Sequence, residues 1–96
     1  MYARVVRWEG GDGDAMRRAA AEMKERGASG PPEGVPATGF TLLIDPDGGR
    51  GIAISLFETE DDLRKGDETL NSMDPPEGVG KRASVDRYEV GVEFRQ

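Results

Sequence analysis

Four short apolar segments, separated by turns and polar helices, constrain the fold more than any other feature of the sequence. The first, YARVVRWE at Tyr2–Glu9, is rich in β-branched and aromatic residues and predicts a strand. The next two, FTLLID at Phe40–Asp45 and GIAISLFE at Gly51–Glu58, are joined by a short Gly-rich turn and therefore predict an antiparallel hairpin. The fourth, ASVDRYEVGVEF at Ala83–Phe94, alternates like a strand, with its last four apolar side chains on one side: Tyr88, Val90, Val92 and Phe94.

Two amphipathic helices are predicted between these strands. The first covers Asp14–Arg26, with Asp12 or Asp14 as its cap and Gly27 as its end. Its apolar residues recur at helical spacing and form one narrow stripe: Ala15, Met16, Ala19, Ala20 and Met23. The second begins at Thr59, which is spaced from Asp62 as in a capping box. Four of its residues share one face: Leu63, Gly66, Leu70 and Met73.

The element order β-α-β-β-α-β predicts a single α+β domain, residues 1–96, of ferredoxin-like fold. Its four-stranded antiparallel sheet would carry both helices on one face, with the strand order 4-1-3-2 that right-handed crossovers give. Apolar residues occur in both phases of the strands, as with Val5 and Trp8 in the first one. A sheet with two apolar faces needs a second cover, so we expect a homodimer formed through the face without helices.

Two missing residue types exclude several classes of function. The 96 residues include no Cys and no His, which rules out disulfides, Cys- or His-ligated zinc, thiol nucleophiles and Ser-His-Asp triads. The net charge of −6 argues against nucleic acid as a partner. Because no apolar run approaches the ~20 residues that span a bilayer, and no signal peptide opens the sequence, we expect a cytoplasmic protein with no membrane partner and no cofactor.

The sequence resembles the dimeric α+β barrel superfamily, specifically its antibiotic-biosynthesis-monooxygenase-like members. The resemblance covers nearly the whole chain and rests on the element order, the opening YARVVRWE, the segment GRGIAISLFETEDDL and the closing VDRYEVGVEF. It implies two sheets packed face to face, with a small cavity in each subunit. It also implies, for an enzyme, cofactor-independent oxygenation of an aromatic substrate. Haem-degrading members use a His ligand, which this chain does not have.

The cofactor-free oxygenases of this family are associated with an Asn, Trp, Arg and Tyr grouping around the substrate. The residues of those types available to such a grouping are Asn71, Trp8, Arg4, Arg7, Arg87 and Tyr88. In such an enzyme the carbanion of the substrate would reduce oxygen, and Arg and Tyr would stabilise the developing negative charge. No motif in the sequence fixes which residue would take which role.

We expect a ligand pocket between the sheet and the helices. Its candidate ligand-binding residues are Arg4, Trp8, Phe40, Phe57, Leu63, Gly66, Met73 and Tyr88. Each has a structural alternative: Trp8 and Phe57 can be core residues, and Tyr88 can simply anchor the last strand. Gly66 leaves room either for a small cavity or for close packing of the helix on the sheet.

Arg4 and Arg7 fall on opposite faces of the first strand, so one of them points into an apolar layer. A buried guanidinium needs a carboxylate partner, and Glu89 or Glu93 on the last strand is the expected one. The alternative is that the arginine binds an anion. DPDGGRGI at Asp45–Ile52 resembles the start of a calcium loop, but Leu56 stands where such a loop needs its Glu, so a hairpin turn is favoured.

The pentapeptide PPEGV occurs twice, at Pro31–Val35 and Pro75–Val79. Each copy follows a predicted helix and precedes a predicted strand, so the repeat is better explained as a turn at equivalent points of two halves than as a ligand motif. The first copy lies in a long connection, from Gly27 to Gly39, which could form the rim of the pocket.

Two functions are consistent with these patterns. The first is a homodimer that binds a small, largely apolar or aromatic molecule, with monooxygenase-like activity if it is an enzyme. The alternative is a non-enzymatic structural, interaction or ligand-sensing dimer whose cavity is filled by side chains.

Overall fold

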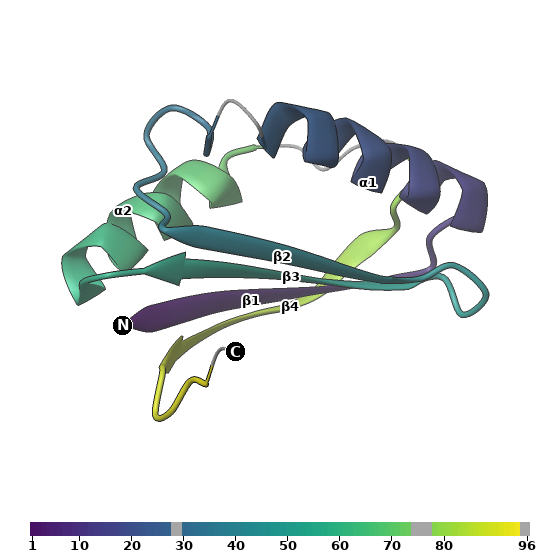
Figure 1. Cartoon of the computed structure of the whole chain (residues 1–96). Coiled ribbons are helices and arrows are strands. Elements are labelled where there is room, and N and C mark those ends of the chain that lie inside the picture. The colour runs from purple at the N-terminus through teal and green to yellow at the C-terminus, as the bar shows by residue number, and fades with distance from the viewer. Residues whose placement is uncertain (28–29, 74–77, 95–96) are drawn as a thin grey trace.

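The computed structural model describes residues 1–27, 30–73 and 78–94, and it confirms the predicted element order. The strands are β1 (Tyr2–Glu9), β2 (Gly39–Asp45), β3 (Arg50–Phe57) and β4 (Lys81–Glu89), and the helices are α1 (Gly13–Gly27) and α2 (Glu60–Asn71). The strands form one antiparallel sheet in the order β2-β3-β1-β4, which is the predicted order read from the other edge. Both helices lie on the same face of this sheet (Figure 1). The fold is therefore ferredoxin-like.

Each helix begins at a capping side chain, because the first N–H groups of a helix have no partner inside it. The Asp12 carboxylate accepts a hydrogen bond of 3.0 Å from the N–H of Ala15, and α1 starts directly after it. The Thr59 hydroxyl accepts one of 3.1 Å from the N–H of Asp62 at the start of α2. The predicted cap at Thr59 is confirmed, and Asp12 rather than Asp14 caps the first helix.

The strand register decides which side chains lie under the helices. Val6 pairs with Ala53 and Tyr2 with Phe57, so these two pairs share the helix-facing side of the sheet. Val6 and Phe57 are almost completely buried there. One core cluster contains Val35, Phe57 and Leu63, with Tyr2, Ala37 and Leu70 packed against it.

The first PPEGV copy is attached to the second helix. Val35 is buried in the core cluster, and the Thr69 hydroxyl donates a hydrogen bond of 3.1 Å to the carbonyl of Gly34. This part of the long connection is therefore packed against α2. In the second copy, Pro75 to Glu77 lie outside the described residues.

The last strand is shorter than predicted. It ends at Glu89, whereas the alternation in the sequence predicts a strand as far as Phe94. Glu89 pairs with Tyr2, the first residue of β1, and the N–H of Val90 donates a hydrogen bond of 2.9 Å to the carbonyl of Met1. Because a strand needs a neighbouring strand to bond to, the pairing stops where β1 begins.

None of the helices in the described ranges is long and apolar enough to cross a membrane.

Candidate functional site

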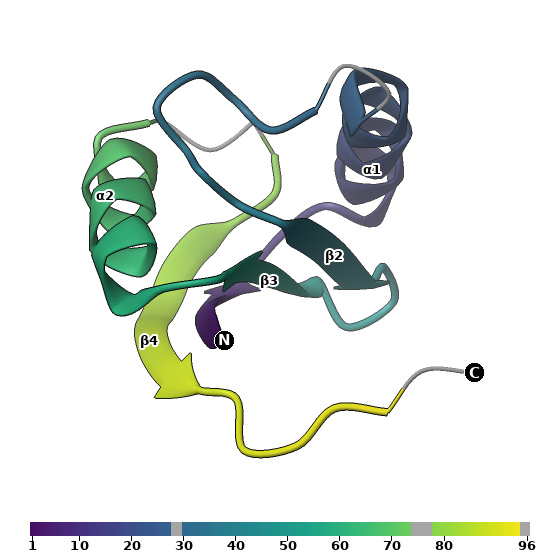
Figure 2. The ribbon, with the colours of Figure 1, turned by 60° about the vertical axis from the view of Figure 1, so that its left-hand side comes forward.

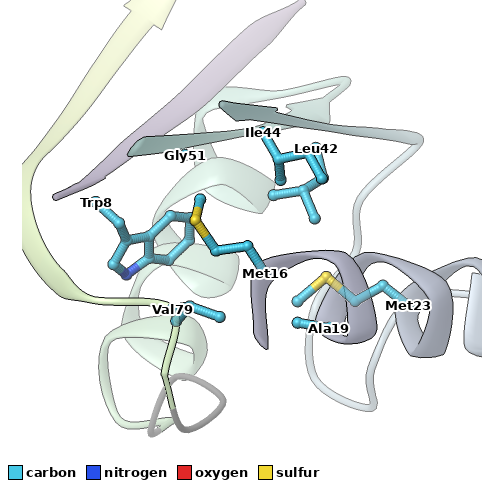
Figure 3. A pocket seen from close by; sticks show the side chains of 8 residues that line it. All are labelled: Trp8, Met16, Ala19, Met23, Leu42, Ile44, Gly51 and Val79. Atoms are coloured by element: carbon cyan, nitrogen blue, oxygen red, sulfur yellow. The ribbon is translucent and has the colours of Figure 1, made fainter. Parts of the chain in front are cut away.

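An apolar pocket lies between α1 and the helix-facing side of the sheet (Figure 3). It encloses about 40 Å³. Its walls come from both layers and from the segment before β4: Trp8, Met16, Ala19, Met23, Leu42, Ile44, Gly51 and Val79. We call this the Trp8 pocket.

Local structure explains why a pocket forms here. Gly51 is the register partner of Trp8 and has no side chain, which leaves space beside the indole ring. A Cβ at Gly51 would lie 3.4 Å from Cε of Met16 and 3.9 Å from Cε3 of Trp8, which are ordinary contact distances. The predicted apolar stripe of α1 supplies Met16, Ala19 and Met23, which Figure 3 shows along one side of the pocket.

The Trp8 pocket contains one polar atom without a partner. The indole nitrogen of Trp8 is buried, and no acceptor for its N–H occurs among residues 1–27, 30–73 and 78–94. In Figure 3 this nitrogen is on the side of the ring nearer to Val79. Leaving a buried N–H unpaired costs about 1–3 kcal/mol, so an acceptor that reached it would be favoured.

A second, wider depression lies on the surface beside the start of α2. It measures about 350 Å³ and is lined by Tyr2, Glu60, Leu63, Arg64, Arg87, Tyr88 and Glu89. Its walls mix two arginines with two glutamates, so it has no single charge that would select an anion or a cation.

A buried ion-pair network joins α2 to the sheet. Nε of Arg4 donates to Oδ1 of Asp67 at 2.8 Å, and a second nitrogen of Arg4 donates to Oδ1 of Asn71 at 2.8 Å. Arg87 donates to the other oxygen of Asp67 at 2.6 Å. Arg4 and Asp67 are buried, whereas most of the Arg87 side chain is exposed.

The pKa of Asp67 reflects two opposing effects. Burial raises the pKa of this carboxyl, but the hydrogen bonds from Arg4 and Arg87, together with their positive charges, lower it below its usual value. Asp67 is therefore a carboxylate at neutral pH, and it neutralises part of the charge of the two arginines.

The prediction for the partner of the buried arginine is wrong. Arg4 is indeed the buried one of the two and Arg7 is exposed, but Arg4 pairs with Asp67 rather than with Glu89 or Glu93. The register places Arg87, not a glutamate, directly opposite Arg4. Two like charges opposite each other need a counterion, and α2 supplies it from above the sheet.

The structure does not bring the predicted ligand-binding residues into one pocket. Trp8 lines the Trp8 pocket, whereas Leu63 and Tyr88 border the surface depression. Phe57 belongs to the core, and about half of the Phe40, Met73 and Tyr88 surface is exposed. Arg4 is in the network with Asp67.

Gly66 provides close packing and not a cavity. A Cβ at this position would lie 2.5 Å from Cε1 and 2.6 Å from Cζ of Phe57, closer than such atoms can approach. The helix therefore rests directly on the Phe57 ring, which is the structural alternative weighed for this glycine.

Sequence reasoning missed most of the Trp8 pocket. Met16, Ala19 and Met23 were recognised as the apolar stripe of the first helix, but not as pocket walls. The signal that could have found them is the pairing of Trp8 with a glycine, and that pairing is visible only once the register of β1 on β3 is known.

The segment after β2 forms the favoured hairpin turn. Asp45 accepts two hydrogen bonds from Arg50, at 3.0 and 2.7 Å, and one of 3.1 Å from the N–H of Gly48. These bonds, first from Arg50 and then from Gly48, lower the pKa of Asp45. No group of three or more acidic side chains that could hold a metal ion occurs in the part of the chain that the structure describes.

Comparison with known proteins adds no family. No protein-family model, no curated protein and no solved structure matches this chain.

Proposed function

We propose that this protein binds a small, largely apolar or aromatic molecule in the Trp8 pocket. The observation that carries the proposal is the buried, unpaired indole N–H of Trp8 beside walls that are otherwise apolar. Ligand sites are mostly apolar, with a few polar groups that fix orientation. A ligand with one carbonyl or similar acceptor oxygen would match this arrangement.

The pocket can adapt to such a ligand. Its 40 Å³ would hold about three water molecules, since one water needs about 10–15 Å³ of such space. Two of its walls are the methionines Met16 and Met23. Methionine has three rotatable side-chain bonds and readily changes shape, so a ligand could enlarge the space by moving these two side chains.

The test is a calorimetric titration with two matched probes, tetralone and tetralin, which differ by one carbonyl oxygen. We expect saturable binding of tetralone and weaker binding of tetralin, because only tetralone can accept the Trp8 hydrogen bond. Gly51→Ala adds a methyl group to the pocket wall without a clash and should weaken tetralone binding by about tenfold, equal to about 1.4 kcal/mol.

Gly27→Ala is the matched control, because a Cβ there meets nothing within 4 Å. It should leave tetralone binding unchanged. Equal binding of the two probes, or no effect of Gly51→Ala, would refute the Trp8 pocket as the site.

The geometry supports binding more than catalysis. An oxygenase of the resembled kind would need Arg, Asn or Tyr side chains free to contact the substrate. Here Arg4 donates to both Asp67 and Asn71, and Arg87 donates to Asp67. Tyr88 is on the opposite face of the sheet from Trp8, since it pairs with Ala3. Oxygen uptake with anthrone as substrate, lost in a Trp8→Phe variant, would establish the enzymatic form of the function.

The non-enzymatic alternative is favoured by one observation, the small size of the cavity. Side chains already fill most of the space between α1 and the sheet, leaving only about 40 Å³. A protein of this kind would act through its surface as an interaction module. A stable assembly that binds neither probe would support this second function.

A further inference from the structure

The surface depression beside the start of α2 lies between that helix and β4. Figure 2 shows the two elements side by side and running in opposite directions. Two hydrogen bonds fix how they are aligned: Arg87 donates to Asp67, and Arg82 donates to the carbonyl of Leu70. The first residues of α2 are therefore level with the last residues of β4.

Each of these two walls carries one glutamate and one arginine, and all four side chains line the depression. Glu60 and Arg64 are four residues apart on α2, so they share one face of the helix and lie about 6 Å apart along its axis. Glu89 and Arg87 are two residues apart on β4, so they share one side of the strand and lie about 7 Å apart along it.

The alignment places both glutamates toward one end of the depression and both arginines toward the other. Arg87 is bonded to Asp67, and Arg64 is three residues before Asp67 on the helix. Glu60 is the first residue of the helix, and Glu89 is the last residue of β4. The depression therefore has a carboxylate end and a guanidinium end, separated by about 6–7 Å.

The four charged groups retain the capacity to bind a ligand. All of them are exposed. Neither Glu60 nor Glu89 takes part in an ion pair within residues 1–27, 30–73 and 78–94. Arg64 and Arg87 are each bonded to one aspartate through one nitrogen. A guanidinium has five N–H donors, so each arginine can also donate to a second acceptor.

The remaining walls of the depression are apolar or aromatic: Tyr2, Leu63 and Tyr88. Tyr2 packs against the core cluster that contains Leu63, so this part of the wall is held in place by the core. The volume of about 350 Å³ is at the lower end of the roughly 300–1,000 Å³ that ligand pockets occupy. Such walls offer a short alkyl chain a surface to pack against.

We propose that this depression binds a small zwitterion, an amino acid whose ammonium and carboxylate groups are separated by a short alkyl chain. The ammonium donates to the two glutamates and the carboxylate accepts from the two arginines, as charge-assisted hydrogen bonds. A simple anion or cation would be attracted by one end and repelled by the other. δ-Aminovalerate has the matching spacing, because its ammonium nitrogen and carboxylate carbon are about 6 Å apart in the extended chain.

This site is separate from the one proposed for an apolar ligand. The depression shares no lining residue with the Trp8 pocket. Tetralone should therefore not displace δ-aminovalerate, and either ligand can fail to bind without bearing on the other.

The first test is an NMR titration of the isotope-labelled chain with δ-aminovalerate and two matched probes, valerate and pentylamine, each of which lacks one of its two charges. We expect saturable shifts at the start of α2 and the end of β4, and binding of either probe weaker by at least about tenfold. Binding should also weaken in about 1 M salt, where the Debye length is about 3 Å.

The spacing of the charges is tested with two further amino acids. The charges of glycine are closer together than those of δ-aminovalerate, and those of ω-aminooctanoate are farther apart. Both should bind more weakly than δ-aminovalerate, because neither can reach both ends of the depression in an extended conformation.

The second test changes one residue of each wall. Arg64→Gln on α2 and Glu89→Gln on β4 each remove one charge from an exposed side chain, and each should weaken δ-aminovalerate binding by about threefold. Arg18→Gln and Glu22→Gln make the same charge changes on the exposed side of α1 and should leave binding unchanged.

Three results would overturn the proposal. One is the absence of saturable binding by any of these amino acids. Another is binding of valerate or pentylamine as tight as that of δ-aminovalerate, which would make the depression a site for a single charge. The last is equal weakening by Glu89→Gln and Glu22→Gln, which would assign the binding to the net charge of the chain.

Discussion

At the scale of single residues, the main polar feature is the pair formed by Arg4 and Asp67. Breaking a buried ion pair by removing one partner is strongly destabilising, because it leaves the other charge buried without compensation. Arg4 has a second acceptor in Asn71, but that amide is neutral and cannot replace the charge of Asp67. The packing of α2 on the sheet therefore depends on one carboxylate, that of Asp67.

Asp67→Asn should lower the free energy of unfolding by about 3–5 kcal/mol, the usual loss for a broken buried pair. The side chain keeps its size but loses its charge and one of the two oxygens that accept from Arg4 and Arg87, so the loss measures the ion-paired network. Urea unfolding followed by circular dichroism gives the value. Asp61→Asn is the control, because Asp61 pairs with Arg64 and Lys65 on the exposed side of α2 and should change stability little. Equal effects of the two variants would contradict the role of Asp67.

The sequence predicted the burial of one arginine but not its partner. Alternation along β1 separates Arg4 from Arg7, and that separation is a local property of any strand. The identity of the partner depends on the register of β4 and on how α2 is rotated over the sheet. Both are decided by contacts between segments that are more than 60 residues apart in the case of Arg4 and Asp67.

At the scale of elements, the close approach of α2 to β3 depends on Gly66. Glycine is normally unfavourable inside a helix, by about 1 kcal/mol relative to alanine. Here it allows the helix backbone to rest on the fully buried ring of Phe57. Leu63 and Gly66 of the predicted apolar face are buried, whereas Met73 lies beyond the end of α2 and is 44% exposed. Whether the glycine left a cavity or a contact depended on the position of the helix.

Gly66→Ala should destabilise the protein by about 1–3 kcal/mol, because overpacking against Phe57 outweighs the gain in helix propensity. Thermal and urea unfolding measure the change. Gly27→Ala in α1 meets no neighbour and should be neutral or slightly stabilising. In a chain that also carries Phe57→Leu, Gly66→Ala should lower the free energy of unfolding by less. An unchanged loss would mean that contact with the Phe57 ring is not its cause.

At the scale of the whole molecule, the ion pair links stability to pH. The folded pKa of Asp67 lies below its unfolded value of about 3.9. The contribution of the ionised Asp67 to the free energy of unfolding is therefore present above pH 4, and it is lost as the pH falls through the folded pKa.

The unfolding free energy should therefore fall on acidification below about pH 4. The difference between the native chain and Asp67→Asn should fall with it, since a protonated Asp67 is as neutral as asparagine. Urea unfolding of both chains between neutral pH and about pH 2.5 isolates this group from the other carboxylates, which the two chains share. A difference that did not change with pH would assign the loss in Asp67→Asn to the missing acceptor oxygen and not to the charge.

The sequence by itself determined the elements, their order and the strand topology. These follow from local properties: the period of the apolar residues, the caps at Asp12 and Thr59, and the short turn after Asp45, each of which acts over a few residues. Right-handed crossovers then leave few arrangements for the sheet.

Only the tertiary structure decided the register, the helix positions and the ends of pairing. The register places Trp8 opposite Gly51, in a pocket beside α1. The position of α2 brings Asp67 to Arg4. The end of pairing with β1 stops β4 at Glu89, although the strand pattern of the sequence continues to Phe94. The physical reason is the same in each case. The period of the side chains is a property of their own segment, but the partner of each side chain is a property of another segment.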